Sequence, residues 1–298
     1  DVSGVVGDVP APMVLIDTGT VSKDLILAAR QHGTPSNGTF WLSAEALTLG
    51  TDTTNPGGGP DAAMSGSGTN NYVRTSFATA TLTTRLSWVP SLSDAQAVAM
   101  RGTFRLYGVV RRNAATSTLT IQPGWGAPGT TLSTGSVVTI STSLNRQLVD
   151  LGLISYGSVD STGGLSTTAP PSVELDLAAA RSGGTDTLDW DGFYLVPADE
   201  STLVYTGNVP TTSDLVIDSG TGSCYSVENG GNVFDGTGAI TYENAPSAGG
   251  FPVLVPNQTN RFVYIKPKFG AHEMDKTLTG SVTVHYWPRY LYTRPVST

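Results

Sequence analysis

Apolar and polar residues alternate in short runs along most of the chain, most plainly within residues 185–197. Leu188 and Trp190 fall on one face of an extended strand, and Asp189 and Asp191 fall on the other. Side chains of a strand point alternately to its two faces, so this stretch is predicted to bury one face and to expose the two aspartates. We expect the last strand of a β-sandwich here.

The second half of this stretch is apolar without alternation. Gly192 permits a kink, the run 193–196 is expected to be buried on both faces, and Pro197 cannot donate to a neighbouring strand. The strand should therefore end at Pro197, and a second structural body should begin shortly afterwards.

Many other short strands are predicted by the same pattern. We expect them at residues 13–17, 24–30, 40–45, 72–77, 81–88, 103–112, 117–122, 136–141, 147–152, 172–177, 203–205, 214–219, 223–227, 251–256, 260–266 and 279–287. Residues 50–71 are predicted as a long exposed loop, and the Pro/Gly-rich residues 123–129 as a turn. One short connecting helix is expected, since Ser93 and Gln96 form a capping-box pattern and Gly102 follows as a stop.

Short strands with turn signals every eight to twelve residues are typical of a sandwich or jelly roll. The predicted fold is therefore all-β, with two jelly-roll-like β-sandwich domains of antiparallel sheets. We divide the 298 residues into an extended Gly/Val/Pro-rich arm at 1–12, a jelly-roll domain at 13–198 and a smaller C-terminal sandwich at 199–298.

Composition and charge limit the kinds of partner that the chain is expected to bind. The net charge is −8 and the sequence pI about 4.7, and no stripe of Lys or Arg is present, so a nucleic-acid ligand is not expected. No apolar run approaches the roughly 20 residues that span a bilayer, so no membrane partner is expected. The single cysteine, Cys224, is predicted to be a small core residue.

No motif in the sequence carries evident chemistry. His32, His272 and His285 have no metal-ligand spacing, and phosphate-loop and nucleophile-elbow motifs are absent. We therefore expect no cofactor, no metal and no enzymatic activity. Two alternatives stay open, a glycosidase-like carboxylate pair and a calcium ion near residues 186–191. The acids concerned are Asp176, Asp186, Asp189 and Asp191, which are otherwise expected on solvated faces.

Two sets of stretches resemble proteins of tailed bacteriophage virions. Residues 148–152, 173–177 and 188–197 resemble the late strands of a carbohydrate-binding-module-like jelly roll that is found inserted in such proteins. Residues 215–219, 251–257 and 281–291 are similar to the C-terminal galectin-like sandwich of distal tail and related baseplate proteins. Distal tail proteins usually begin with a ring-forming domain, whereas this chain begins with the arm and a jelly roll.

The resemblance implies a structural component of the phage tail or baseplate, located in the virion, which assembles by symmetric contacts with other virion proteins. A homo-oligomer, trimer or hexamer, is expected. The candidate assembly contacts lie in the arm and in the C-terminal aromatic segment: Val2, Val5, Val6, Val9, Trp287, Arg289, Tyr290 and Tyr292. Deleting residues 1–9 is expected to abolish assembly and to leave the melting transition nearly unchanged.

The alternative function is recognition of a host cell-surface glycan by the jelly roll. Aromatic rings stack on sugars, and Trp41 and Trp125 are the candidate glycan contacts. A scaffold and a glycan-binding module are distinguished by saturable sugar binding.

Overall fold

The computed structural model describes the greater part of the chain. The described residues are 3–18, 25–30, 41–55, 72–78, 80–90, 102–156, 173–198, 201–205, 213–228, 233–235, 240–242, 251, 253–257, 260–265, 267–268, 273–274 and 282–289. They confirm the all-β fold, with antiparallel pairing between all the paired strands and a single short 3₁₀ turn, η2 (Ala44–Ala46). The helix predicted near Ser93 lies outside the described residues.

The chain forms two units, and their division differs from the predicted one. The terminal unit comprises residues 1–31, 200–266 and 278–298, and the central unit comprises residues 32–199 and 267–277. The first two strands thus belong with the C-terminal part of the chain, whereas the division predicted from the sequence placed them in the jelly-roll domain. The reason is strand pairing over a long sequence separation, which local alternation does not encode.

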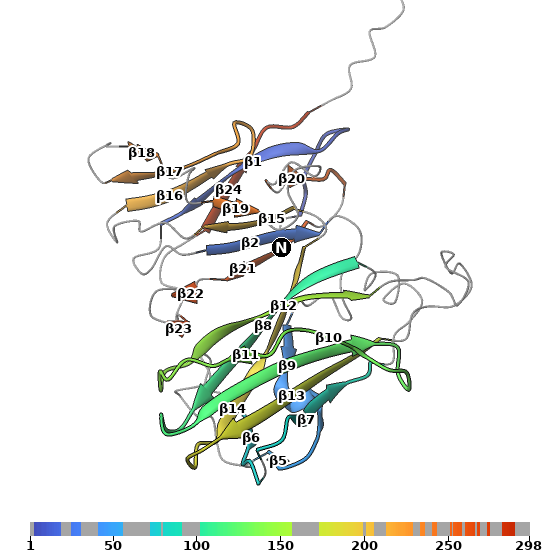
Figure 1. Cartoon of the computed structure of the whole chain (residues 1–298). Helices are drawn as coiled ribbons and strands as arrows, with labels where there is room; N and C mark the ends of the chain where they lie inside the picture. The colour runs from blue at the N-terminus through green and yellow to red at the C-terminus, as the bar shows by residue number, and fades with distance from the viewer. Residues whose placement is uncertain are drawn as a thin grey trace, which may run out of the picture. The chain divides into compact units, whose positions relative to one another are not determined.

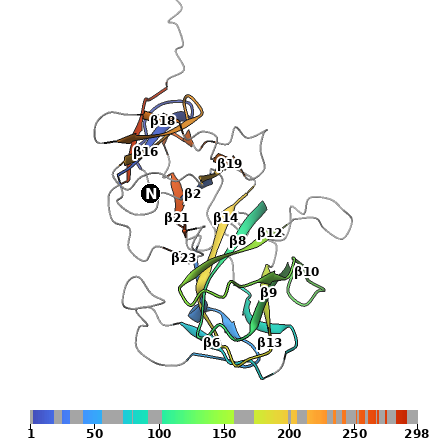
Figure 2. The ribbon, with the colours of Figure 1, turned by 60° about the vertical axis from the view of Figure 1, so that its left-hand side comes forward.

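The central unit contains two sheets that form two layers (Figures 1 and 2). The β9 sheet has the order β10-β9-β13-β7-β4, with β11 also on β9, and the β14 sheet has the order β12-β8-β14-β6-β5, with β3 also on β14. The strands of the β9 sheet are β4 (Thr48–Leu49), β7 (Thr83–Trp88), β9 (Thr118–Gly126), β10 (Ser133–Thr134), β11 (Val138–Thr139) and β13 (Glu174–Ser182). Those of the β14 sheet are β3 (Trp41–Ser43), β5 (Thr53–Thr54), β6 (Val73–Thr75), β8 (Gly102–Arg112), β12 (Gln147–Tyr156) and β14 (Leu188–Pro197). A two-residue pair, β22 (Pro267–Lys268) with β23 (Glu273–Met274), completes the unit.

The core of the central unit lies between these sheets. Trp190, Phe193 and Phe104 come from the β14 sheet and meet Ile121 and Leu177 from the β9 sheet, all in one buried cluster. Burial of large apolar side chains contributes about 1.5–3 kcal/mol each and holds the two layers together. The prediction that Leu188 and Trp190 face the core is confirmed.

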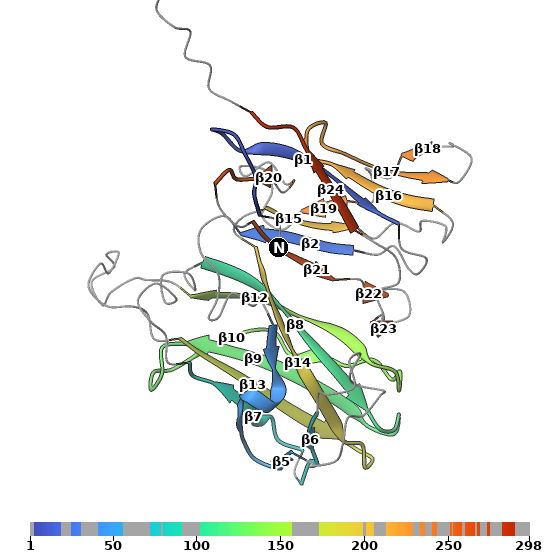
Figure 3. The same cartoon turned by 180° about the vertical axis from the view of Figure 1, so that it is seen from behind.

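The terminal unit also has two sheets. The β1 sheet has the order β18-β17-β16-β1, and β1 (Ala11–Asp17) pairs on its other side with β24 (Val282–Tyr286) and with β20 (Val253–Leu254) (Figure 3). Its other strands are β16 (Ser213–Asp218), β17 (Ser223–Glu228) and β18 (Val233–Asp235). The β2 sheet has the order β19-β15-β2-β21, made by β19 (Ile240–Tyr242), β15 (Ser201–Tyr205), β2 (Leu25–Arg30) and β21 (Arg261–Ile265).

A second buried cluster fills the terminal unit. Met13 and Leu15 of β1 and Ile217 of β16 contribute to it, and Phe262 of the β2 sheet packs against it. Cys224 is fully buried in the same cluster, as predicted.

Two local predictions in the central unit are corrected or refined. The turn predicted at residues 123–129 is wrong in its first half, because β9 runs through Pro123 to Gly126 and pairs there with β13. The Pro123 carbonyl accepts a hydrogen bond from the Gly135 amide, 2.9 Å away. Because the N–H and C=O positions of one strand residue point to the same side, the missing N–H of Pro123 faces the break between β10 and β11 and not β13. The kink predicted at Gly192 is present as a register shift between Trp190 and Gly192.

Candidate functional site

The three aspartates near β14 are buried and each is paired with an arginine. Asp189 accepts hydrogen bonds from Arg74 Nε at 2.6 Å and Nη2 at 2.8 Å. Asp186 and Asp191 form ion pairs with Arg112 and Arg146, respectively. The prediction that these acids lie on a solvated face is wrong, because the exposed fractions of Asp186, Asp189 and Asp191 are 0%, 1% and 3%. With every carboxylate already bound to its own guanidinium, these acids act as structural ties between strands and loops.

Asp186 has the most complete set of partners. Its carboxylate accepts hydrogen bonds from Arg112, from the Thr116 hydroxyl and from the backbone amides of Thr116 and Ser117 at 3.2 Å each. Burial raises the pKa of Asp186, but the hydrogen bonds from Thr116 and Arg112 outweigh burial and lower this pKa to about 2. Asp191 differs, since burial raises its pKa despite the charge of Arg146.

The lowered pKa of Asp186 predicts acid sensitivity. A carboxyl with a depressed pKa stabilises the folded state fully above its ordinary value of 3.8, and that stabilisation is lost as the pH falls toward about 2. We expect the wild type to lose more stability than Asp186→Asn between about pH 4 and about pH 2. Urea unfolding of both proteins across this range measures the difference. Parallel pH curves would contradict the assignment. The raised pKa of Asp191 acts in the opposite direction in both proteins and cancels in the comparison.

Asp176 is the fourth acid of the predicted set. It is half-buried on β13 and accepts hydrogen bonds from Thr84 at 3.3 Å and Ser87 at 2.6 Å, both on β7. It thus ties neighbouring strands of the β9 sheet and belongs to the opposite layer from Asp189 and Asp191.

The predicted glycan contacts, Trp41 and Trp125, are not brought together. Trp41 lies on β3 of the β14 sheet and packs on Tyr194 with ring centroids 4.6 Å apart. It also covers Gly192, where an added Cβ would stand 2.4 Å from the indole ring. Trp125 lies on β9 of the other sheet and packs against the core cluster. No shared sugar platform is formed by these two rings.

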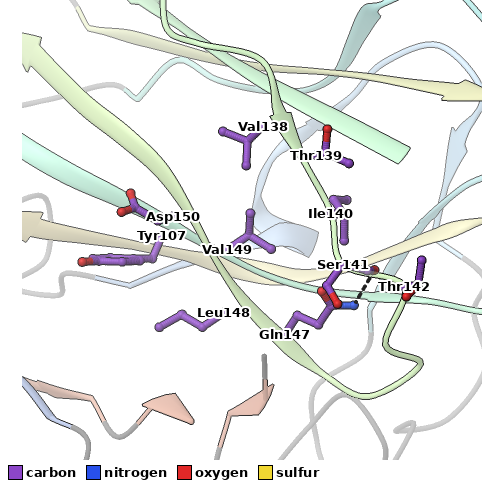
Figure 4. Close-up of a pocket in the computed structure, with 10 residues that line it drawn as sticks. All are labelled: Tyr107, Val138, Thr139, Ile140, Ser141, Thr142, Gln147, Leu148, Val149 and Asp150. Carbon is purple, nitrogen blue, oxygen red and sulfur yellow. Dashed lines mark hydrogen bonds between the residues drawn. The ribbon is translucent and has the colours of Figure 1, made fainter. Parts of the chain in front are cut away.

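A different hollow lies at the edge of the central unit. It has a volume of about 600 Å³ and is lined by Tyr107 of β8, by residues 147–150 of β12 and by residues 138–142 around β11 (Figure 4). In the close-up, the Asp150 carboxylate lies beside the Tyr107 ring and Val138 faces Val149. Asp150 is exposed and pairs with Arg105, the Nη2 to Oδ2 distance being 2.6 Å.

One wall of this hollow is fixed by the Gln147 side chain. Its Nε2 donates to the Ser141 carbonyl at 3.3 Å (Figure 4). It also donates to the Ser143 carbonyl at 2.6 Å, and the two bonds hold the segment after β11 against β12. No sequence motif marks the hollow, because its walls come from two edge strands of different sheets. The paired position of Tyr107 and Asp150 on β8 and β12 is visible only once the register is known.

The predicted assembly contacts of the arm divide into buried and exposed residues. Val5 is 2% exposed and belongs to the core cluster of the terminal unit, whereas Val6 is 48% exposed and Val9 is half-buried. Val2 lies outside the described residues. The arm is therefore docked on its own unit, and the structure argues against the expectation that its removal leaves the melting transition unchanged.

Two of the C-terminal candidates, Trp287 and Arg289, follow the outer strand β24 of the β1 sheet. β24 pairs with β1 on one side, and the described residues provide no strand on its other side. Trp287 follows β24 directly and is 65% exposed, and Arg289 is exposed two residues later. His285 is an exposed residue of the same strand. Tyr290, Tyr292, His32 and His272 lie outside the described residues.

The described part of the chain holds no group of three or more His, Cys, Asp or Glu side chains that would suit a metal ion. It also contains no helix with the length and hydropathy needed to cross a bilayer. In comparisons with known proteins, neither a family model nor a curated protein matches the sequence.

Proposed function

We propose that this chain is a structural component of a tailed-phage virion, a tail or baseplate protein that works by association with copies of itself and with other virion proteins. The observation that carries the proposal is β24, beside which the described residues place no further strand, with Trp287 at its end. Unpaired strand edges pair with other chains unless they are covered, and tryptophan is enriched among the residues that dominate interface energies. Val282, 44% exposed, adds apolar surface to this edge.

Replacing Trp287 tests this surface. We expect Trp287→Ser to weaken assembly, so that light scattering detects smaller species than for the wild type. The protein concentration needed for assembly should rise by at least about tenfold. Its stability should change by no more than about 0.5 kcal/mol, since the side chain is largely exposed. Val137→Ser is the matched control, because Val137 is 53% exposed and belongs to the central unit, whereas β24 belongs to the terminal unit. Unaltered assembly of Trp287→Ser would refute this contact.

The placement in the virion has its own test. Antibody raised against the chain and viewed on virions by electron microscopy should label the tail or its tip. Label confined to the capsid, or absent from virions, would overturn the tail assignment.

A second candidate function is glycan binding by the central unit. It is supported by the hollow beside β12, which combines the Tyr107 ring, the exposed Asp150 carboxylate and the apolar Val138. Sugar sites join an aromatic or apolar surface to a few polar groups in this way. A calorimetric titration with host polysaccharide should then saturate with wild type and fail with Asp150→Ala. Asp214→Ala on β16 of the terminal unit is the charge-matched control. A pure scaffold gives no saturable heat.

A further inference from the structure

The N-terminal arm is bound by its own unit in the way that a peptide ligand is bound. Backbone amides of Asp8 and Val9 donate to the Arg289 carbonyl at 2.8 and 3.4 Å. The Asn257 amide donates to the Val5 carbonyl at 3.0 Å, and its side-chain Nδ2 donates to the Gly7 carbonyl at 3.4 Å. These partners are about 250 or more residues away in sequence, so the arm is held from the side and not by its neighbours in the chain.

The side chains complete the contact. The Tyr286 hydroxyl accepts from the Val6 amide at 3.2 Å and donates to the Gly4 carbonyl at 3.5 Å. Val5 inserts into the buried cluster that includes Phe251 and Leu254. We call the receiving segments, Phe251, Leu254, Asn257, Tyr286 and Arg289, the cradle.

The cradle accepts a narrow class of sequence. Gly4 and Gly7 both have positive φ, +72° and +132°, a region that favours glycine. At Gly7 an added Cβ would stand 2.7 Å from the Arg289 carbonyl oxygen, so the backbones touch. The fitting ligand is a Gly-apolar-apolar-Gly segment that bends at its second glycine and has one buried valine.

We propose that in the assembled protein the cradle of one copy is filled by the arm of a second copy. This rests on the proposed function, since it supplies a contact for the association described there. The occupant is the arm because this segment is already seated in the cradle and has the two glycines and the valine that it demands. Pro10 is exposed and directly precedes β1, so a change of direction at this residue exchanges the arm between copies and leaves the pairing of β1 in place. Exchange of an identical element between protomers is a low-cost route to an oligomer.

A synthetic peptide with the sequence of residues 1–10, labelled with a fluorophore, tests whether the cradle is a receptor. In the full chain carrying Val5→Asp, the cradle should be vacant, because a carboxylate cannot replace the buried valine without a large desolvation cost. We expect this variant to bind the peptide at least about tenfold more tightly than the wild type, whose own arm competes. A peptide carrying Gly7→Val is the control and should bind at least about tenfold more weakly. Equal binding of both peptides, or no binding to a folded variant, overturns the proposal.

A second protein avoids the question of whether Val5→Asp folds. A site for a specific protease is inserted between Val9 and Pro10, and the arm is severed after folding. The severed arm should remain associated and should exchange with the labelled peptide. Loss of the arm without peptide uptake, while circular dichroism stays unchanged, contradicts a receptor role.

Exchange between copies is tested by mixing. Tagged Val5→Asp chain, with its vacant cradle, should retain untagged wild-type chain through the wild-type arm, and excess peptide should release it. If the peptide binds but no such complex forms, the cradle binds its arm only within one chain and the proposed exchange is wrong. If the complex forms but Trp287→Ser assembles normally, the proposed contact at β24 is refuted and the proposed arm exchange is supported. The two proposals therefore fail separately.

Discussion

Replacing Arg112 by methionine should lower the free energy of unfolding of the central unit by about 3–5 kcal/mol, because it leaves the buried carboxylate of Asp186 without its charged partner. Both side chains are fully buried. Arg112 also donates to the carbonyls of Ala114 at 2.6 Å, Ser117 at 2.5 Å and Ser141 at 3.3 Å, so its loss takes a donor from three carbonyls, of which Ser141 keeps the bond from Gln147. Urea unfolding followed by tryptophan fluorescence measures this change, since four of the five tryptophans lie in the central unit.

The exposed ion pair between Arg105 and Asp150 is the internal control. The two side chains are 27% and 42% exposed, and pairs in solvent contribute about 0–1 kcal/mol. Arg105→Met should therefore cost less than about 1 kcal/mol. The double variant Arg112→Met with Asp186→Leu should recover part of the loss, because no charge is left buried. Equal effects of Arg112→Met and Arg105→Met would contradict the structural role of the buried pair.

Alternation along the sequence predicts most strands, and β14 explains why it predicts less about the charges. The alternation of side chains along a strand predicts that Leu188 and Trp190 face the core, and both are buried as predicted. The same rule assigns Asp189 and Asp191 to a polar face, but it does not tell whether a carboxylate there meets solvent or an arginine, and the register shift at Asp191 interrupts the alternation. Arg74 lies 115 positions from Asp189 in the sequence, and Arg146 lies 45 positions from Asp191. Each arginine reaches its aspartate only in the completed sheet.

The limits of local patterns are clearest at β1. Its own alternation is strong enough to predict a strand, and its burial alternates along all seven residues. Its neighbours, β16 and β24, follow about 200 and 270 residues later in the sequence. No feature of residues 11–17 identifies these two strands as its pairing partners. For the same reason, the Gly/Val arm looks free in the sequence, and only the folded chain brings Asn257 and Tyr286 to it.

The candidate sites follow the same logic. The sequence gives Trp287 only as a candidate assembly contact in the C-terminal aromatic segment, and in the structure this residue is 65% exposed. Trp41 and Trp125 are equally large, but one stacks on Tyr194 and the other on the core. An exposed ring is therefore a property of the fold around it and not of its sequence neighbours.

Replacing Trp190 by alanine should destabilise the central unit by about 3–5 kcal/mol, the cost of removing a large buried aromatic and leaving a cavity. The ring is fully buried and lies 5.9 Å from the ring of Phe193. Its Nε1 donates to the Thr75 hydroxyl at 2.9 Å, and this hydroxyl lies 2.9 Å from that of Thr53. The tryptophan thus links β14 to β6 and β5 as well as filling the core. Urea unfolding followed by circular dichroism measures the loss.

Trp190→Phe separates volume from hydrogen bonding. It keeps an aromatic ring in the core and removes the Nε1 donor, so we expect a loss of about 1–2 kcal/mol, close to the net contribution of one buried hydrogen bond plus a small void. Thr75→Val removes the same bond and also the bond to Thr53, so the double variant should lose less than the sum of the two single losses, by about the contribution of the shared bond. Full additivity of the two would mean that the bond between the indole and Thr75 does not hold β6 to β14, and that the strands are joined there by backbone pairing alone.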